Sequence, residues 1–548
     1  MVNWFSGFFP MLKIALVILL GTGSVQLLAQ MASTGNGAPK NLILIIGDGM
    51  GPQQIGLLEA YARQAPRSVI KERTTAFSRL LAEGGVLGMS MTNAANVLNT
   101  DSAASATQLA IGKPSGPQMI GIDIDGNPDP TILEIANKLG KSTGLVSDVR
   151  LTHATPASFA AHQPQRSMEN EIAVNMLAVG ADVMLSGGLR HWVPQQANDP
   201  TTATYQQLRQ ITAGAVEIRS ERKDDRNLLE EARQRGYQLV FNKSQLEQAG
   251  GNKILGLFAA SALPDAITAQ RLRNNNGTIP TLTEMSAKAI TTLAKNDKGF
   301  FLMIEAGLID WAAHYNDTGT MLHEMLVINE VLNHVLDWAG DRDDTLVVVT
   351  ADHETGGFGF SYSSVNLPKP VTFPGSAFPG AQFQPTSNYG NLDVLDKLYA
   401  QKLSYTGIFS NNFDTLNAEQ QTPLKLMELV NQYTEFNITR SQAARILTTA
   451  VNPYYVKDHN SLGYKIVPKM DVNAAFYSHP TDDNRQNLLA IEVANSQSVV
   501  WSNGNHTATP VMVFASGPKQ TTAQFIQLMD HPQLGQILLK IVKGNKDQ

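Results

Sequence analysis

The feature of this 548-residue chain that most constrains its fold is a repeated alternation of short apolar runs with helical patterns. The first run, residues 41–49 (NLILIIGDG), ends in polar residues, and residues 131–140 are typical of a helix that ends at a glycine. Further strand-like runs lie at 142–149, 181–188, 237–242, 253–259, 299–307 and 345–357, and further helical patterns at 228–236, 282–297 and 320–340. This alternation predicts an α/β fold: a three-layer αβα sandwich around a mostly parallel sheet.

The alternation stops after about Gly357. Residues 367–390 are rich in proline, glycine and aromatic residues, which is typical of irregular surface structure. Residues 423–436 and 439–451 have helical patterns, and residues 510–518 resemble a strand that returns to the main sheet. We therefore predict one α/β domain of residues 40–361 and 503–548, interrupted by a large insertion, residues 362–502, that forms a surface loop or crown.

The N-terminal segment differs from the rest of the chain. Lys13 precedes an apolar run that ends at about Leu20, and Ala29 offers a small residue for cleavage. This pattern predicts a secretory signal peptide at 1–29 and a periplasmic or secreted protein. The alternative is an uncleaved membrane anchor, although the apolar run is shorter than the roughly 20 residues that a spanning helix needs.

Composition excludes some chemistry. The formal net charge is −6 and the sequence has no basic run, which argues against a specific nucleic-acid partner. The chain contains no cysteine, so it has no disulfides, no thiolate ligands and no cysteine nucleophile. Any metal ion must be held by histidines and carboxylates.

The stretch LNTDSAASATQLAIG, residues 98–112, places Asp101 and Ser102 at the start of a predicted helix. One interpretation is a helix cap, because Asp and Ser are favoured at that position. The other is a nucleophile aimed at an anion, because the N-terminus of a helix offers free N–H groups and the positive end of the helix dipole. This stretch alone favours the cap.

Acidic and histidine side chains follow the ends of several predicted strands, where ligands bind in open α/β sheets. Each has an ordinary structural interpretation when taken alone, such as a turn or an i,i+4 pair. They are Asp48, Glu305, Asp310, His314, Asp352, His353 and His506. Together they form a set of ligands suited to Zn²⁺ and Mg²⁺ at one edge of the sheet. The alternative is an unusually acidic hydrogen-bond network.

At these residues the chain resembles the alkaline phosphatase family. The motifs GDGMG, TDSAASAT, HATPASF, IEAGLIDWAAH, ADHETGG and NHT occur in the family's order. The resemblance covers roughly residues 41–357 and 506–518, and the motifs together are highly specific although each alone is weak. It implies the family's αβα fold and, by analogy, a homodimer.

The resemblance also implies a role for each matched residue. Ser102 would be the nucleophile and Arg166 would clamp phosphate oxygens. The implied ligand sets are Asp310, His314 and His506 for one Zn²⁺; Asp48, Asp352, His353 and, exchangeably, Ser102 for a second; and Asp48, Thr155 and Glu305 for Mg²⁺. The sequence has His153 where some members have Asp, and Trp311 where some have Lys. Trp311 cannot supply the cation of a lysine.

The function that the resemblance implies is metal-dependent hydrolysis of small phosphate monoesters through a phosphoserine intermediate. One alternative is a phosphodiesterase or a sulfatase-like relative on the same scaffold; sulfatases use a modified Cys or Ser, and the chain has no Cys. The other alternative is a catalytically inactive binding protein whose insertion is an interaction domain. A complete set of ligands argues against inactivity.

Overall fold

We describe a computed structural model of the chain, covering residues 39–275, 277–459, 461–477 and 484–544. The predicted signal peptide lies outside these residues and stays a prediction. Within them, we find no helix with the length and apolar character needed to cross a bilayer.

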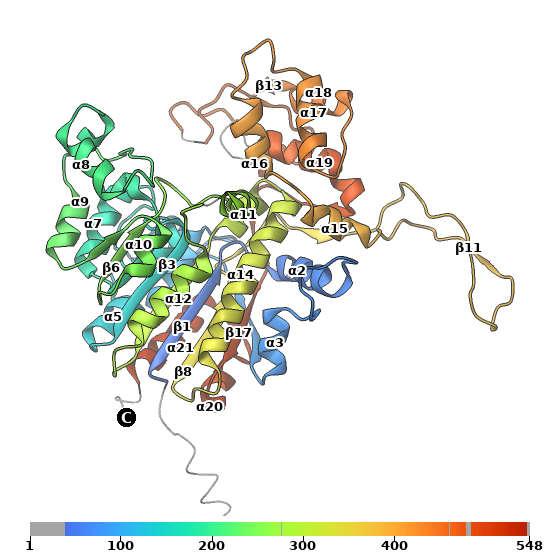
Figure 1. Cartoon of the computed structure of the whole chain (residues 1–548). Helices are drawn as coiled ribbons and strands as arrows, with labels where there is room; N and C mark the ends of the chain where they lie inside the picture. Colours follow the sequence, from blue (N-terminus) through green and yellow to red (C-terminus); the bar gives the residue numbers. More distant parts are fainter. Residues whose placement is uncertain (1–38, 276, 460, 478–483, 545–548) are drawn as a thin grey trace, which may run out of the picture. The chain divides into compact units, whose positions relative to one another are not determined.

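The central feature is a ten-stranded sheet in the order β18-β2-β17-β8-β1-β7-β3-β4-β6-β5 (Figure 1). Its strands are β1 (Asn41–Gly47), β2 (Val86–Met91), β3 (Ser142–Arg150), β4 (Val183–Gly187), β5 (Gln238–Val240), β6 (Ile254–Leu257), β7 (Phe300–Ala306), β8 (Thr345–Thr350), β17 (Val511–Ser516) and β18 (Leu528–Asp530). All neighbours pair in parallel except β17, which runs antiparallel to β2 and β8. The predicted mostly parallel sheet, and the return of the late strand to it, are confirmed.

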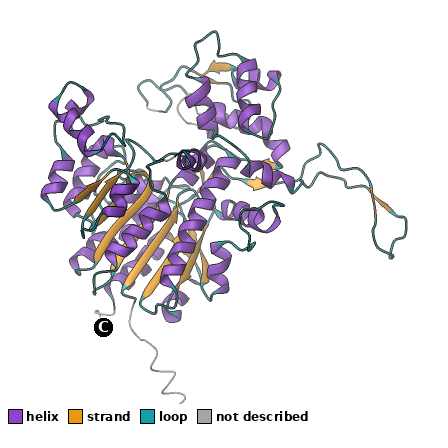
Figure 2. Cartoon of the chain, in the orientation of Figure 1, coloured by secondary structure: helices purple, strands orange, loops and turns teal. Residues whose placement is uncertain are grey.

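Helices cover both faces of the sheet (Figure 2). One apolar cluster includes α2 (Pro52–Gln64), α3 (Ala76–Ala82), α10 (Lys243–Gln248), α12 (Leu282–Leu293) and α14 (Thr318–Ala339). The other includes α4 (Ser102–Ile111), α5 (Ile132–Lys138), α7 (Glu169–Val179), α8 (Ala203–Ile211), α9 (Leu228–Gln234) and α21 (His531–Lys543). Alternate residues of β1 join opposite clusters, Ile43 in the first and Leu44 in the second, as a strand buried on both faces requires.

Local signals in the sequence set the ends of these helices. Thr131 and Glu134 form a reciprocal capping box at the start of α5, which satisfies two backbone N–H groups that would otherwise lack partners. Gly112 adopts φ 67° directly after α4, a left-handed conformation that glycine adopts without steric cost. The predicted helices at 131–140, 228–236, 282–297 and 320–340 are confirmed.

The order of the strands brings the ends of β1, β7 and β8 side by side. β1 lies between β7 and β8 and runs parallel to both. Ile46 pairs with Glu305 on one side and with Thr350 on the other. Loops that follow three adjacent parallel strands therefore begin at the same edge.

Residues 362–502 begin just after β10 (Gly359–Phe360) and include, near their end, its pairing partner β15 (Val499–Val500). They carry α15 (Asp393–Tyr399), α16 (Tyr405–Ile408), α17 (Pro423–Tyr433), α18 (Arg440–Ile446) and α19 (Asn484–Gln497), and the strand pairs β11 (Val371–Thr372) with β12 (Gln382–Phe383) and β13 (Thr449–Val451) with β14 (Ile466–Pro468). The arm with β11 extends from the rest of this segment (Figure 1). Apolar residues of α15 and α19 join the cluster that contains α2 and α14.

Candidate active site

Ser102 is the first residue of α4, and Asp101 caps this helix. The Asp101 carboxylate accepts hydrogen bonds from the backbone N–H of Ala104 at 3.2 Å and of Gln118 at 2.9 Å. The cap predicted from the sequence is therefore confirmed. The side chain of Ser102 is buried, and its Oγ lies 3.1 Å from Nε2 of His353. A capping carboxylate and a hydroxyl directed at an imidazole thus coexist at one helix N-terminus.

Arg166 lies beside the same helix N-terminus. Its Nη1 donates to Asp101 Oδ2 at 3.0 Å, and its Nη2 lies 3.1 Å from Nε2 of His153. Burial would raise the pKa of Asp101, but Arg166 and the two backbone donors outweigh it and lower that pKa. Arg166 and Ser102 line one open cleft. A fixed guanidinium at the mouth of a helix is a suitable site for a phosphoryl group.

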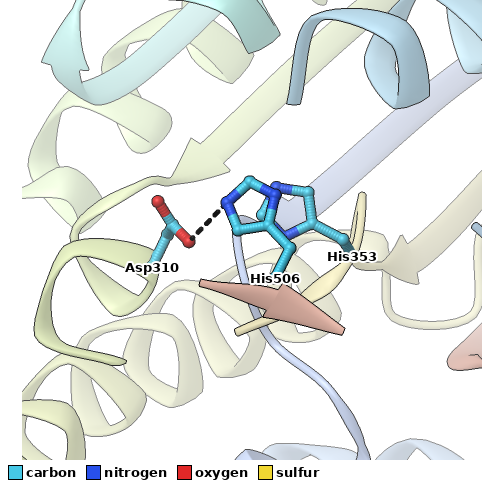
Figure 3. Close-up of side chains that lie close together, drawn as sticks. All are labelled: Asp310, His353 and His506. Atoms are coloured by element: carbon cyan, nitrogen blue, oxygen red, sulfur yellow. Dashed lines mark ion pairs between the residues drawn. The ribbon is translucent and has the colours of Figure 1, made fainter. Parts of the chain in front are cut away.

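Asp310, His314 and His506 converge on one point. His314 Nε2 lies 3.2 Å from Asp310 Oδ2 and 3.1 Å from His506 Nε2, while His506 Nε2 lies 3.6 Å from Asp310 Oδ1. Tetrahedral zinc with bonds of about 2.0–2.2 Å needs donor atoms separated by about 3.3 Å. The His353 ring stacks on that of His506 at 3.5 Å, so His353 lies against this group as well (Figure 3).

The other nitrogen of each of these rings has a partner that orients it. His314 Nδ1 lies 2.7 Å from the carbonyl oxygen of Gly504, and His506 Nδ1 lies 3.0 Å from that of Thr100. A carbonyl oxygen accepts only, so each Nδ1 carries the proton and Nε2 is the nitrogen that can act as a ligand. Fixing of the ring through the remote nitrogen is typical of histidines that bind metals.

Two further groups share Asp48. One contains Asp48, Asp352 and His353, with His353 Nε2 at 3.4 Å from Asp48 Oδ1 and 3.2 Å from Asp352 Oδ2. The other contains Asp48, His153 and Glu305, with His153 Nδ1 at 4.0 Å from Glu305 Oε1. All five side chains are buried. Asp48 therefore lies between two potential cation sites.

Three of these carboxylates are buried close to one another, which disfavours their charged forms. Burial, and then the neighbouring Asp352, raise the pKa of Asp48 well above its ordinary value. Burial raises the pKa of Asp352 to about 7 and that of Glu305 to about 8. Among the described residues, none donates a hydrogen bond to Asp48 Oδ1, Asp352 Oδ2 or Glu305 Oε1. Buried carboxylates with free lone pairs fit bound cations, since unpaired charge is costly inside a protein.

Two predicted residues, Thr155 and Trp311, lie at the margin of these groups. Thr155 Oγ1 donates to Asp48 Oδ2 at 3.4 Å, which is a long contact. Trp311 lines the cleft with Ser102, and its ring meets the His153 ring edge-on at 6.3 Å. The structure thus brings every residue named from the sequence to one region.

Asp148 is a buried acid that the sequence analysis missed. It lies near the end of β3, and its Oδ1 accepts from the backbone N–H of Gly307 at 2.6 Å, just before α13 (Leu308–His314). Burial raises its pKa to about 7. A signal existed, since an acid within a predicted buried strand needs a partner. Asp148 anchors the start of the helix that carries Asp310 and His314.

This raised pKa predicts a specific pH dependence of stability. The folded protein binds the Asp148 proton more tightly than the unfolded chain does, so this contribution is complete below about pH 4 and is lost as the pH rises through about 7. Asp148→Asn cannot titrate, while its amide oxygen still accepts from Gly307. Its free energy of unfolding should therefore not show this decrease with rising pH, which amounts to about 1.4 kcal/mol for each unit by which the pKa is raised.

The measurement is urea unfolding of metal-free protein at pH 4.5 and pH 8. The exposed Asp343→Asn variant serves as the control, and it should follow the wild type at both values. Equal pH dependence in wild type and Asp148→Asn would contradict the expectation.

An αβα fold with a serine at a helix mouth and buried carboxylate–imidazole groups defines a metal-dependent α/β enzyme. The family model described as Alkaline phosphatase matches residues 39–543. The chain is 34% identical over 348 residues to "Alkaline phosphatase 3" of Bacillus subtilis (63% of this chain, 68% of the relative), and 33% identical over 343 residues to "Alkaline phosphatase" of Escherichia coli (57% and 70%). The crystal structure of Thermus thermophilus alkaline phosphatase superposes with a TM-score of 0.68 at 25% identity, covering 95% of each chain.

The chain belongs to the alkaline phosphatase family. The family supports hydrolysis of phosphate monoesters with metal cofactors, and the clustered ligands described above agree with a metal-dependent enzyme. The roles of individual residues and the identity of each metal go beyond what family membership supplies.

Proposed function

We propose that the protein hydrolyses small phosphate monoesters by displacement at Ser102, through a phosphoserine intermediate. The observation that carries this proposal is the position of Ser102 Oγ at the N-terminus of α4, 3.1 Å from His353 and in one cleft with Arg166. Oγ forms a bond to phosphorus as the ester P–O bond breaks, and the leaving alkoxide takes up a proton. Water then attacks phosphorus and the Oγ–P bond breaks. Inorganic phosphate is released and the Ser102 hydroxyl is regenerated.

The residues that would hold metals follow the three groups. One Zn²⁺ would be held by Asp310, His314 and His506, a second by Asp48, Asp352 and His353 with Ser102, and Mg²⁺ by Asp48, Thr155 and Glu305, with His153 beside them. When bound, these ions supply Lewis-acid stabilisation of charge on phosphoryl oxygens and lower the pKa of the serine hydroxyl. The raised carboxylate pKa values and the oriented imidazoles support this assignment.

The chain's own groups add the rest of the stabilisation. The first backbone N–H groups of α4 and the positive end of its dipole face a phosphoryl group bound at Ser102. The guanidinium of Arg166, held by Asp101, can donate two parallel hydrogen bonds to two non-bridging oxygens. Both are preorganised before substrate binds, which favours the transition state over water.

We expect a strong preference for monoesters over diesters, on the order of a thousandfold in kcat/KM. A monoester dianion offers three non-bridging oxygens, whereas a diester carries less charge and a second organic group that collides with Arg166. Arg166→Ala should therefore lower monoester turnover about 10- to 100-fold more than diester turnover, which is the worth of one or two charge-assisted hydrogen bonds.

The test compares kcat/KM for p-nitrophenyl phosphate and bis-p-nitrophenyl phosphate in wild type and Arg166→Ala. Arg209→Ala, which removes an exposed arginine of α8, is the matched control and should leave the ratio unchanged. Faster diester hydrolysis by the wild type would favour the phosphodiesterase alternative.

We also propose that the protein is a periplasmic or secreted homodimer and that the insertion contributes to self-association. The arm around β11 and β12 exposes Phe373, Phe378 and Phe383, with Phe378 64% exposed. The centroid of the Phe373 ring lies 5.8 Å from that of Phe378 and 5.8 Å from that of Phe383, so the three rings form a small apolar patch. Exposed patches of this kind mark interaction surfaces.

Replacement of these three phenylalanines by serine should lower the dimer fraction in analytical ultracentrifugation while the turnover per subunit is retained. A variant with serine at Leu98, which is 90% exposed and lies outside the arm, controls for loss of apolar surface alone. An unchanged sedimentation profile would exclude the arm from the dimer contact.

A further inference from the structure

Three segments meet at the C-terminal end of α13, where His314 is the last helical residue. The first is α13 itself, the second is the loop that precedes β16 (His506–Thr507), and the third is α19 in the segment predicted as an insertion. The His314 ring already contacts the second segment through the carbonyl oxygen of Gly504 at 2.7 Å. The third segment reaches the same point through one asparagine.

Asn487 of α19 is completely buried, and its amide group contacts the end of α13. Nδ2 donates to the backbone oxygen of His314 at 2.8 Å and to Oδ1 of Asn316 at 2.7 Å. Both partners present oxygen acceptors, so only the orientation with the NH₂ group toward them satisfies the contacts. Oδ1 of Asn487 has no donor within the described residues. Asn487 therefore uses both of its amide protons, while its Oδ1 accepts no hydrogen bond from the described residues.

Asn316 extends this connection. It adopts φ 55°, and its Nδ2 donates to the backbone oxygens of Ala313 at 3.0 Å and of Asn503 at 2.9 Å. The last carbonyl groups of a helix have no partners within the helix. Here the two asparagine amides bind two of them and at the same time join α13 to the loop before His506.

The joint is tightly packed. A Cβ atom at Gly504 would lie 3.2 Å from both Asn487 Nδ2 and the backbone oxygen of His314, and 2.9 Å from the Tyr477 ring. Gly504 thus permits the close approach of the loop and the helix end. The two imidazoles of His314 and His506, with Nε2 atoms 3.1 Å apart, are carried on the two sides of this joint.

We propose that Asn487 is a positioning residue that holds the His314 imidazole at the candidate metal site. This inference rests on the proposed function, in which His314 is a ligand. A small displacement of the end of α13 would change the separation of the two Nε2 atoms, on which ligation depends. Loss of partners outside the ligand shell typically lowers metal affinity 10- to 100-fold.

The test measures zinc binding by metal-free protein, using chelator competition, in a double-mutant cycle of Asn487→Asp and His314→Ala. Aspartate keeps the shape of the side chain but presents oxygen to two acceptors, so it breaks both contacts. One zinc equivalent should bind 10- to 100-fold more weakly in Asn487→Asp, and the remaining equivalents should be unchanged. In the His314→Ala background the same change should have little further effect, because residues that act through one another are not additive.

Asn495→Asp is the matched control, since it makes the same charge change at an exposed position of α19. Asn487→Ala, which removes both donors without adding charge, replaces Asn487→Asp if the latter does not fold, as judged by thermal unfolding of the metal-free protein. Equal zinc affinity in Asn487→Asp and Asn495→Asp would overturn the inference. An equal loss of zinc affinity on Asn487→Asp in the wild-type and His314→Ala backgrounds would also overturn it.

The ligand role of His314 and the positioning role of Asn487 can be contradicted separately. If His314→Ala binds zinc as the wild type does, the ligand role of His314 in the proposed function is wrong. If His314→Ala loses one equivalent and Asn487→Asp loses none, the proposed function stands and the positioning role is wrong.

Discussion

Ser102→Ala should lower kcat for p-nitrophenyl phosphate by about 10³-fold or more while the fold is retained, because the nucleophile is removed and only slow attack by water remains. Arg166 and the N-terminus of α4 would still bind the phosphoryl group, so KM should change far less than kcat. Rapid quenching at low pH followed by mass spectrometry should find phosphate on Ser102 in the wild type and not in the variant.

Ser105→Ala is the matched control, one turn further along α4. The Ser105 hydroxyl donates to the Asp101 carbonyl oxygen at 3.0 Å and does not line the cleft. The Ser105→Ala variant should retain turnover close to that of the wild type. Turnover at the wild-type level by Ser102→Ala would show that the nucleophile has been wrongly assigned.

Removal of metal ions should abolish phosphatase activity, and Zn²⁺ together with Mg²⁺ should restore it. The buried carboxylates then lack the cations that offset their charge, and the barrier to phosphate monoester hydrolysis is among the highest known. Asp310→Ala and His506→Ala should each lower the bound zinc by up to one equivalent per chain, as measured by mass spectrometry of the purified protein for its metal content.

His334→Ala and Asp337→Ala, on α14, provide controls of matching residue type. Both should keep the wild-type zinc content. Full activity in protein verified as free of metal would rule out the metal-dependent mechanism, and zinc content unchanged by Asp310→Ala would remove that residue from the ligand set.

Much of the α/β fold was predictable because the signals are local. The apolar run of β1 and the capping box of α5 depend on residues within a few positions of one another, so short stretches of sequence determine them. The cap at Asp101 belongs to the same class. The antiparallel direction of β17 has no local signal, because strand direction depends on where the chain re-enters the sheet.

The candidate site also combines features that the sequence predicted with features that only the packing of distant segments decides. Residue types and motif order in the sequence indicated which side chains carry the chemistry, and the rule that ligands bind at the ends of parallel strands indicated one edge of the sheet. The sequence contained no measure of how close Asp48, Asp352 and Glu305 lie. Their proximity follows from the position of β1 between β7 and β8, which is set by packing across the whole sheet.

By itself, the sequence determined the αβα class, the family resemblance and the inventory of acids, imidazoles and one serine. The tertiary structure decided three further matters: the pairing of His506 with Thr355 across β16 and β9 (Glu354–Thr355), the buried anchor at Asp148, and the contact of Asn487 with the end of α13. These contacts join residues far apart in the chain. Their free energy comes from burial and hydrogen bonds that exist only when the distant segments are packed together, so no local pattern encodes them.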